Sequence, residues 1–325
     1  RWERQASVNF GFDFSLKGGK ISGAADYYIR NTSDLLVNRA LPNITGFGSV
    51  ITNLGKVDNS GFEFSLNTEN LKLNNFIWRS SLAVWSNRNE IVSLYGKVPV
   101  TDASGNTVLT EQDDRANGWF IGKNINTIWD FRILGVWKVE EAAMARSYGF
   151  APGDFKLDDV NKDGKFTVDD RVFLGQTAPK FNLNLRNEFT IYKNFDVSFQ
   201  LYGRFGLLSQ FNEAANVDRF YDRAQFYKRP YWTPTNQIDD YARMMSSLGS
   251  GIGLNVWRKS SFIRVNNVSF AYTTPKRLTD KLKLQSLKVY FNIQNALTVS
   301  PWEYFDPENK GFTPSYGTFG INMTL

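Results

Sequence analysis

The sequence predicts an all-β fold, an antiparallel transmembrane β-barrel segment with long loops at one end. Three observations lead to this prediction. Apolar residues recur at every second position in many stretches, helical patterns are scarce, and short turns alternate with long polar connections. The aromatic share of 15% suits the aromatic girdles of such barrels. No run of 18 apolar residues occurs, so we expect no transmembrane helix.

The first hairpin is the clearest element. In residues 5–16, QASVNFGFDFSL, every even position from Ala6 to Leu16 is apolar, and the odd positions are polar or small. Side chains of a strand alternate between its two faces, so this pattern predicts a strand with one apolar face. Residues 17–20, KGGK, predict a tight turn, and residues 21–30 the return strand.

The same period of two recurs along the chain. It predicts strands at residues 61–67, 181–191, 195–205, 287–294 and 318–325. The single good helix candidate is VEEAAMARSYG at 139–149, which Gly149 and Pro152 would end. We expect extracellular loops at about 95–117, 139–178 and 206–258.

A soluble β-sandwich is the alternative, because its strands also alternate apolar and polar residues. The pattern does not say whether the apolar face meets lipid or a second sheet. The long connections favour the barrel, since turns in a compact sandwich come every 8 to 12 residues. On the polar face, charged residues would point into a hydrated lumen. They are Asp13, Glu63, Arg79, Arg186, Glu188, Asp196 and Arg204.

Composition excludes several classes of function. The chain has no cysteine and no histidine, so thiolate chemistry and histidine-based catalysis are absent. The net charge of +6 is scattered without a basic run, so we expect no nucleic-acid binding. Three adjacent carboxylate pairs, Asp113–Asp114, Glu140–Glu141 and Asp239–Asp240, are better explained as loop charge than as a glycosidase pair. We therefore expect no enzyme.

Residues 159–170, DVNKDGKFTVDD, have the spacing of a calcium loop. Oxygen donors stand at positions 1, 3, 5 and 12, with Gly164 at position 6. The predicted ligands are Asp159, Asn161, Asp163 and Asp170, with the carbonyl of Lys165. No helix follows the loop directly, so the ion would be a structural staple of a surface loop and not a switch. The alternative is a turn rich in Asp and Asn that holds no ion.

The connection 206–258 contains the aromatic run YDRAQFYKRPYWTPTN. Aromatic faces stack on sugar rings and also anchor protein interfaces. The candidate substrate or lid contacts are Phe226, Tyr227, Tyr231 and Trp232. The alternative is a loop whose aromatic residues pack against their neighbours.

Several motifs, in this order, resemble the C-terminal half of the SusC/RagA family of TonB-linked outer-membrane transporters. The family pattern N-x-G-x-V-x-N-x-G-x-E is matched from Asn53 to Glu63. The P-G-D run, the calcium-like loop and the following D-R, G and P are matched from Pro152 to Pro179. S-F-I-R-x-x-N-V is matched from Ser261 to Val268, and D-P-E at 306–308.

The resemblance implies part of a 22-stranded barrel in the outer membrane of a Gram-negative bacterium. It implies import of oligosaccharides or peptides, energised by TonB through an N-terminal part outside this chain. It also implies a SusD-like surface lipoprotein as a lid. We expect a segment of a longer protein, because no signal peptide, TonB box or plug is recognisable, and the last residue, Leu325, is not the usual aromatic. The alternative function is a secreted or surface calcium-binding β-sandwich module that binds carbohydrate.

Overall fold

The computed structural model describes residues 2–40, 49–101, 104–217, 229–247 and 252–325. Its chain divides into two compact units. We call residues 1–125, 178–207 and 260–325 the strand unit, and residues 126–177 and 208–259 the loop unit. No helix in the described ranges is both long and apolar enough to cross a membrane.

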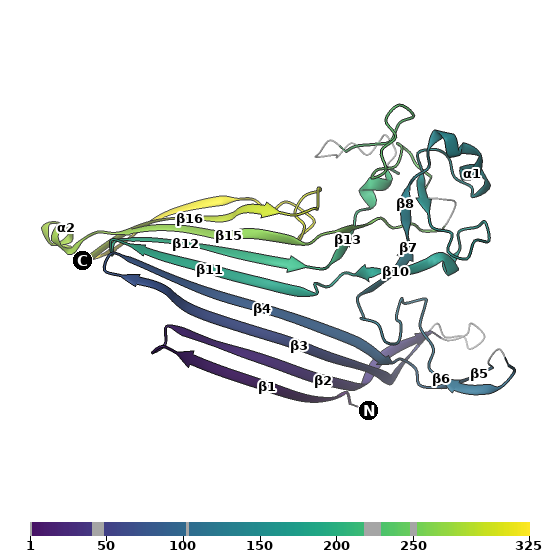
Figure 1. Ribbon diagram of the computed structural model, residues 1–325, viewed down its shortest axis with the longest axis horizontal. Helices are drawn as coiled ribbons and strands as arrows, with labels where there is room; N and C mark the ends of the chain where they lie inside the picture. The colour runs from purple at the N-terminus through teal and green to yellow at the C-terminus, as the bar shows by residue number, and fades with distance from the viewer. Residues whose placement is uncertain (1, 41–48, 102–103, 218–228, 248–251) are drawn as a thin grey trace. The chain divides into compact units, whose positions relative to one another are not determined.

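The strand unit is built on one nine-stranded sheet, in which neighbouring strands are antiparallel (Figure 1). The order is β1-β2-β3-β4-β11-β12-β15-β16-β17, so strands follow the chain from one edge to the other. The strands are β1 (Arg4–Leu16), β2 (Ile21–Ala40), β3 (Ser49–Leu73), β4 (Phe76–Ser93), β11 (Phe181–Ile191), β12 (Phe195–Phe205), β15 (Phe262–Thr273), β16 (Ser286–Val299) and β17 (Tyr316–Thr324). The sheet is open, with β1 and β17 at its edges.

The pairing register of the strands aligns apolar residues with apolar residues, and polar with polar, across the sheet. One row pairs Phe12, Ala25, Phe64, Val84, Leu183, Gly203, Ile263 and Val299. The adjacent row pairs Gly11, Asp26, Glu63, Trp85, Asn182 and Arg204. The first row is apolar and the second largely polar. The alternation of apolar and polar residues within each strand therefore gives the whole sheet one apolar and one polar face.

The apolar face stays exposed. Phe10, Phe12 and Phe319 each keep 66% of their surface accessible. Every other sheet of the described chain has only two strands, and none of them pairs with the nine-stranded sheet. The sandwich alternative requires a second sheet over these rings, so this arrangement supports a lipid-facing surface.

The polar face carries ion pairs between neighbouring residues. Arg186 pairs with Glu188 at 2.7 Å, Arg79 with Glu69 at 3.3 Å, and Lys288 with Asp196 at 3.6 Å. Two tyrosines, Tyr28 and Tyr290, lie over glycines of the next strand. A Cβ at Gly61 would stand 2.4 Å from the Tyr28 ring, so any larger residue there would displace it.

The loop unit has a core of its own. It includes Phe131, Val136, Trp137, Phe150, Phe155, Phe211 and Val256, all buried. Its elements are β7 (Thr127–Phe131), β8 (Ile133–Val136), η2 (Val139–Glu141), α1 (Ala142–Ser147), β9 (Phe155–Leu157), η3 (Val168–Asp170), β10 (Arg171–Gln176), β13 (Leu208–Gln210), η4 (Asn212–Ala215) and β14 (Trp257–Lys259). The predicted helix at 139–149 is therefore shorter, a 3-10 turn followed by six residues of α-helix.

Three further elements belong to the strand unit. β5 (Val98–Thr101) and β6 (Thr107–Thr110) form a small hairpin within the connection predicted at 95–117. The helix α2 (Lys276–Lys281) lies between β15 and β16.

Candidate functional site

The calcium-like loop turns tightly at Gly164, whose φ of +79° is a left-handed conformation that favours glycine. Asp159 Oδ2 accepts hydrogen bonds from the Tyr148 hydroxyl at 2.8 Å and from the Gly164 N–H at 3.0 Å. The N–H of Asp163 donates to Asn161 Oδ1, and the N–H of Lys165 donates to Asp163 Oδ1. Side-chain oxygens at positions 1, 3 and 5 thus all turn toward the loop's own backbone.

Asp170 closes the loop and is fully buried. Its Oδ1 accepts from the Val160 N–H at 2.9 Å, and its Oδ2 accepts from the Thr167 N–H at 2.8 Å. Thr167 is also the N-cap of the short helix η3, since its hydroxyl accepts from the Asp169 N–H. Asp170 therefore ties the start of the loop to its end.

One oxygen of Asp159 is left over: Oδ1 is buried and accepts no hydrogen bond from a described residue. Burial by itself raises the pKa of Asp159, but hydrogen bonds from Tyr148 and from backbone N–H groups outweigh it and lower the pKa. A charged carboxylate with a free oxygen is the chemistry that a cation requires. The described residues nevertheless contain no group of three or more acidic side chains at metal-binding distances. These hydrogen bonds are also expected of a turn rich in Asp and Asn, and calcium stays a prediction.

Aromatic packing holds the loop against α1. The Phe166 ring stacks on Tyr148 with centroids 4.6 Å apart and meets Phe150 edge-on at 5.5 Å. On the other side of the loop, Arg171 lies over Trp129 and Phe131 at 5.6 and 5.2 Å. These contacts fix both ends of the loop within the loop unit.

The two limbs of the loop unit, 126–177 and 208–259, are joined by buried carboxylates. Asp154 has no exposed surface and binds Arg243 at 2.9 Å and the Ser247 hydroxyl at 2.6 Å. Asp130 accepts from Asn255 and from the Trp257 indole at 3.0 and 2.9 Å. Neither residue is among the predicted site residues. The P-G-D motif was a signal for Asp154, but nothing local marked Asp130.

The four aromatic residues predicted to contact a substrate or lid differ in their exposure. Phe226 and Tyr227 lie outside the described residues. Tyr231 is 48% exposed and remains available for contact. Trp232 is only 5% exposed, which fits the alternative of an aromatic residue packed against its neighbours. Its ring packs so closely on Gly153 that a Cβ there would stand 2.6 Å away.

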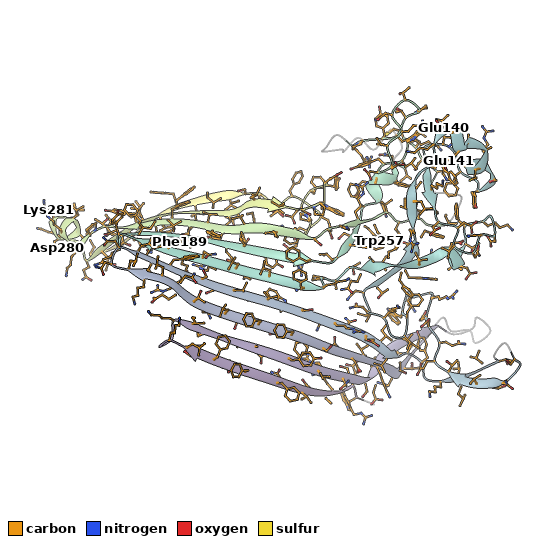
Figure 2. All side chains as sticks on the ribbon, viewed as in Figure 1. Glu140, Glu141, Phe189, Trp257, Asp280 and Lys281 are labelled. Atoms are coloured by element: carbon orange, nitrogen blue, oxygen red, sulfur yellow. The ribbon has the colours of Figure 1, made fainter. Side chains whose placement is uncertain are left out.

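The carboxylate pairs have structural partners. Asp113 accepts from the Ile121 N–H, and Asp114 from Asn117 and the Tyr95 hydroxyl. Glu141 pairs with Lys156, and Asp239 with Lys138 at 2.6 Å. Figure 2 labels Glu140 and Glu141 in the loop unit. Both members of the first pair and one member of each of the other two pairs thus have a structural partner.

Two sequence motifs contact each other in the strand unit. Arg264, from the S-F-I-R stretch, is buried and pairs with Asp306 at 2.6 Å and with Glu308 at 3.2 Å. Glu308 also pairs with Arg204 at 3.3 Å. Asp306 and Glu308 are the acidic residues of D-P-E, so this motif fixes the β16–β17 connection onto β12 and β15.

Comparisons with known proteins agree with this architecture, although no protein-family model matches the chain. The TonB-dependent receptor P26 of Formosa agariphila is 32% identical over 325 residues, which covers 96% of this chain and 32% of that protein. The TonB-dependent receptor SusC of Bacteroides thetaiotaomicron is 26% identical over 95% of this chain and 30% of its own length. The chain therefore spans about a third of the length of these relatives.

Solved structures give the same fold. The RagAB peptide transporter matches all of this chain and 36% of its own chain, with a TM-score of 0.73 at 20% identity. The RagAB peptide importer in the open-open state matches with a TM-score of 0.75 at the same identity. Together with the sequence likeness, this identifies the chain as a barrel segment of the SusC/RagA type of TonB-dependent transporter, in the outer membrane of a Gram-negative bacterium.

Proposed function

We propose that this chain is the C-terminal barrel portion of a nutrient importer that moves oligosaccharides or peptides across the outer membrane. TonB would supply the energy through the N-terminal part of the protein. The observation that carries the proposal is the 32% identity to a TonB-dependent receptor over 96% of this chain. The open sheet supports it, because an exposed apolar face with a charged opposite face suits a barrel wall between lipid and a hydrated lumen.

The experiment is growth of the source bacterium on single nutrients with the full-length gene present or deleted. Growth on one oligosaccharide or one peptide mixture should depend on the gene and should fail equally when TonB is inactivated. Growth that needs the gene but is indifferent to TonB would contradict the energy source. Dependence on neither nutrient class would contradict the substrate proposal.

We also propose that a SusD-like lipoprotein covers the outer end of the barrel and that Tyr231 contributes to this contact. The side chain is exposed, and tyrosine combines a large apolar area with a polar tip. Tyr231→Ala in the full-length protein should weaken co-purification of the lipoprotein, whereas Tyr192→Ala, an exposed tyrosine in a short turn of the strand unit, should leave it unchanged.

Finally, we propose that residues 159–170 hold one calcium ion as a structural staple. Asp159, Asn161, Asp163 and Asp170, with the Lys165 carbonyl, would supply the oxygens. The spacing of these donors, the unpartnered Asp159 oxygen and its lowered pKa support the proposal. Binding would draw three carboxylates toward one ion, whose charge would neutralise them.

A further inference from the structure

The strand unit is strongly basic at one end. Four connections join its strands there: residues 17–20, 74–75, 192–194 and 274–285. They contain seven basic residues but only one acidic residue, Asp280. The basic residues are Lys17, Lys20, Lys193, Lys276, Arg277, Lys281 and Lys283.

This end accounts for the whole charge imbalance of the protein. The chain has 38 basic and 32 acidic residues, so removing seven and one leaves 31 of each elsewhere. All seven side chains are exposed, and none forms an ion pair with a described residue. The positive charge is therefore available to a partner outside this chain.

The helix α2 adds an apolar component to the basic end. Leu278 and Leu282 are one helical turn apart and share a face, and they are 47% and 59% exposed. Thr279, the next residue around the helix, is buried and faces the protein. Figure 2 labels Asp280 and Lys281 on α2, and Figure 1 marks the C-terminus beside this helix. A short helix with exposed leucines beside exposed lysines is suited to a membrane surface.

An aromatic belt fixes the depth of this end. Phe76, Trp78 and Phe189 form a cluster with ring centroids about 6 Å apart, and Phe195 lies 4.7 Å from Tyr272. All five lie within three residues of the strand ends at this rim. Aromatic side chains mark the boundary between hydrocarbon and head groups in membrane barrels. The turns and α2 come directly after that boundary, at the level of lipid head groups.

We propose that the turn end of the strand unit binds anionic phospholipid head groups of the periplasmic leaflet, with α2 as the main anchor. The short turns are at the periplasmic end of such barrels. The basic residues come from three of the four connections of one rim, and such a spread fits a flat membrane surface better than a compact acidic protein. The exposed leucines next to the belt would enter the head-group layer, while the four basic residues of the α2 segment would pair with phosphates.

The test is lipid selectivity of the purified full-length transporter in phosphatidylcholine vesicles. Electron paramagnetic resonance of spin-labelled lipids gives the association of phosphatidylglycerol relative to phosphatidylcholine at the protein surface. One basic residue near an anionic membrane surface favours binding by about fivefold. We therefore expect a preference of about fivefold for phosphatidylglycerol at low salt, which falls toward one in about 0.5 M salt because charges are screened.

A variant and a matched control locate the effect. The α2 variant carries Lys276→Gln, Arg277→Gln, Lys281→Gln and Lys283→Gln. The control removes four exposed charges from the other regions, by Lys97→Gln, Arg146→Gln, Lys162→Gln and Lys259→Gln. The α2 variant should lose at least half of the preference, and the control should keep it.

Heat-modifiable migration on a gel confirms that each variant is folded. A wild-type protein without a preference would overturn the proposal, and so would an equal loss in both variants or no loss in the α2 variant. Nutrient uptake is measured separately. A transporter that fails the lipid test but still imports its substrate disproves only the lipid contact.

Discussion

Phe10 and Phe12 in the nine-stranded sheet expose 66% of their surface, whereas Phe131 and Trp137 in the loop unit expose 2%. Both regions belong to one chain and have a similar share of aromatic residues. The sheet is held together by hydrogen bonds between the backbones of neighbouring strands. Its aromatic rings can point outward because lipid is itself apolar. The loop unit must bury its rings against each other, as water requires. The position of the aromatic side chains thus reports which solvent each region faces.

The largest effect, a failure of barrel assembly, should come from a charge introduced on the lipid-facing side of the sheet. Phe199→Arg in β12 would place a guanidinium in hydrocarbon, which costs about 2 to 4 kcal/mol near the bilayer midplane. We expect the full-length protein to fail barrel assembly, measured as loss of heat-modifiable migration. Ser198→Arg, one residue earlier on the polar face, is the control and should assemble. Normal migration of the Phe199 variant would contradict a lipid-facing surface.

The next largest effect is a loss of stability confined to the loop unit. Asp154→Ala removes a fully buried carboxylate and leaves Arg243 without its partner, a change that costs about 3 kcal/mol. Hydrogen exchange of the full-length protein should speed up in residues 126–177 and 208–259, while the strands stay protected. Asp158→Ala is the control, because Asp158 pairs with Arg132 at the surface and such pairs contribute little. Equal acceleration of hydrogen exchange in the two variants would mean that the buried Asp154–Arg243 pair stabilises the loop unit no more than the surface pair does.

A smaller and more local effect is expected at residues 159–170. Asp159→Ala combined with Asp163→Ala should accelerate hydrogen exchange in residues 154–175 and leave the sheet unchanged. A chelator should have the same effect on the wild type and no further effect on the double variant. Asp169→Ala, at a position that is not a predicted ligand, should respond like the wild type.

An experimental map provides the decisive check of the same loop. Bound calcium would lie 2.3 to 2.6 Å from its oxygens. An ordered loop whose centre contains a water at about 2.8 Å from its neighbours would disprove the calcium proposal.

The smallest effect is that of acid on the loop unit. The backbone N–H of Lys138 and the ammonium of Lys156 lower the pKa of Glu141 below its ordinary 4.5. A hydrogen bond from Lys138 lowers the pKa of Asp239 below 3.8. A carboxyl group with a lowered pKa stabilises the folded state above its ordinary pKa, and this contribution disappears as the pH falls through the lowered value.

Each pair is partly exposed, so we expect less than about 1 kcal/mol from either. Hydrogen exchange in the loop unit should therefore increase slightly below about pH 4, after correction for the intrinsic rate. Lys138→Met should reduce that acid sensitivity. Equal sensitivity of the variant and the wild type would show that other groups determine it.

The sheet was largely predictable because its signal is local. The stretches 181–191 and 195–205 coincide with β11 and β12, and the first strand begins one residue earlier than its pattern. Alternation is written into each strand, so a single sequence suffices to find it. The bulges, such as that between Val265 and Asn267, leave no such mark.

The loop unit was not predictable, because its contacts join distant residues. In the sequence, Trp232 is an aromatic residue within a polar run. Only the structure places it beside Gly153 and Arg243. Asp130 meets Trp257 across 127 positions, and no periodicity connects them. The calcium spacing was visible in the sequence, but spacing alone does not distinguish a bound ion from the hydrogen bonds that Asp159 and Asp170 make.

The order of the two limbs has a consequence for biogenesis. One limb precedes the β11–β12 hairpin in the chain and the other follows it. During synthesis and export, the first limb emerges before Arg243 and Trp257, the partners of its buried Asp154 and Asp130, which follow 89 and 127 positions later. Closing so long a loop is slow, and exposed apolar surface invites aggregation in the meantime. We therefore expect the loop unit to complete its packing only after the second limb has followed the hairpin.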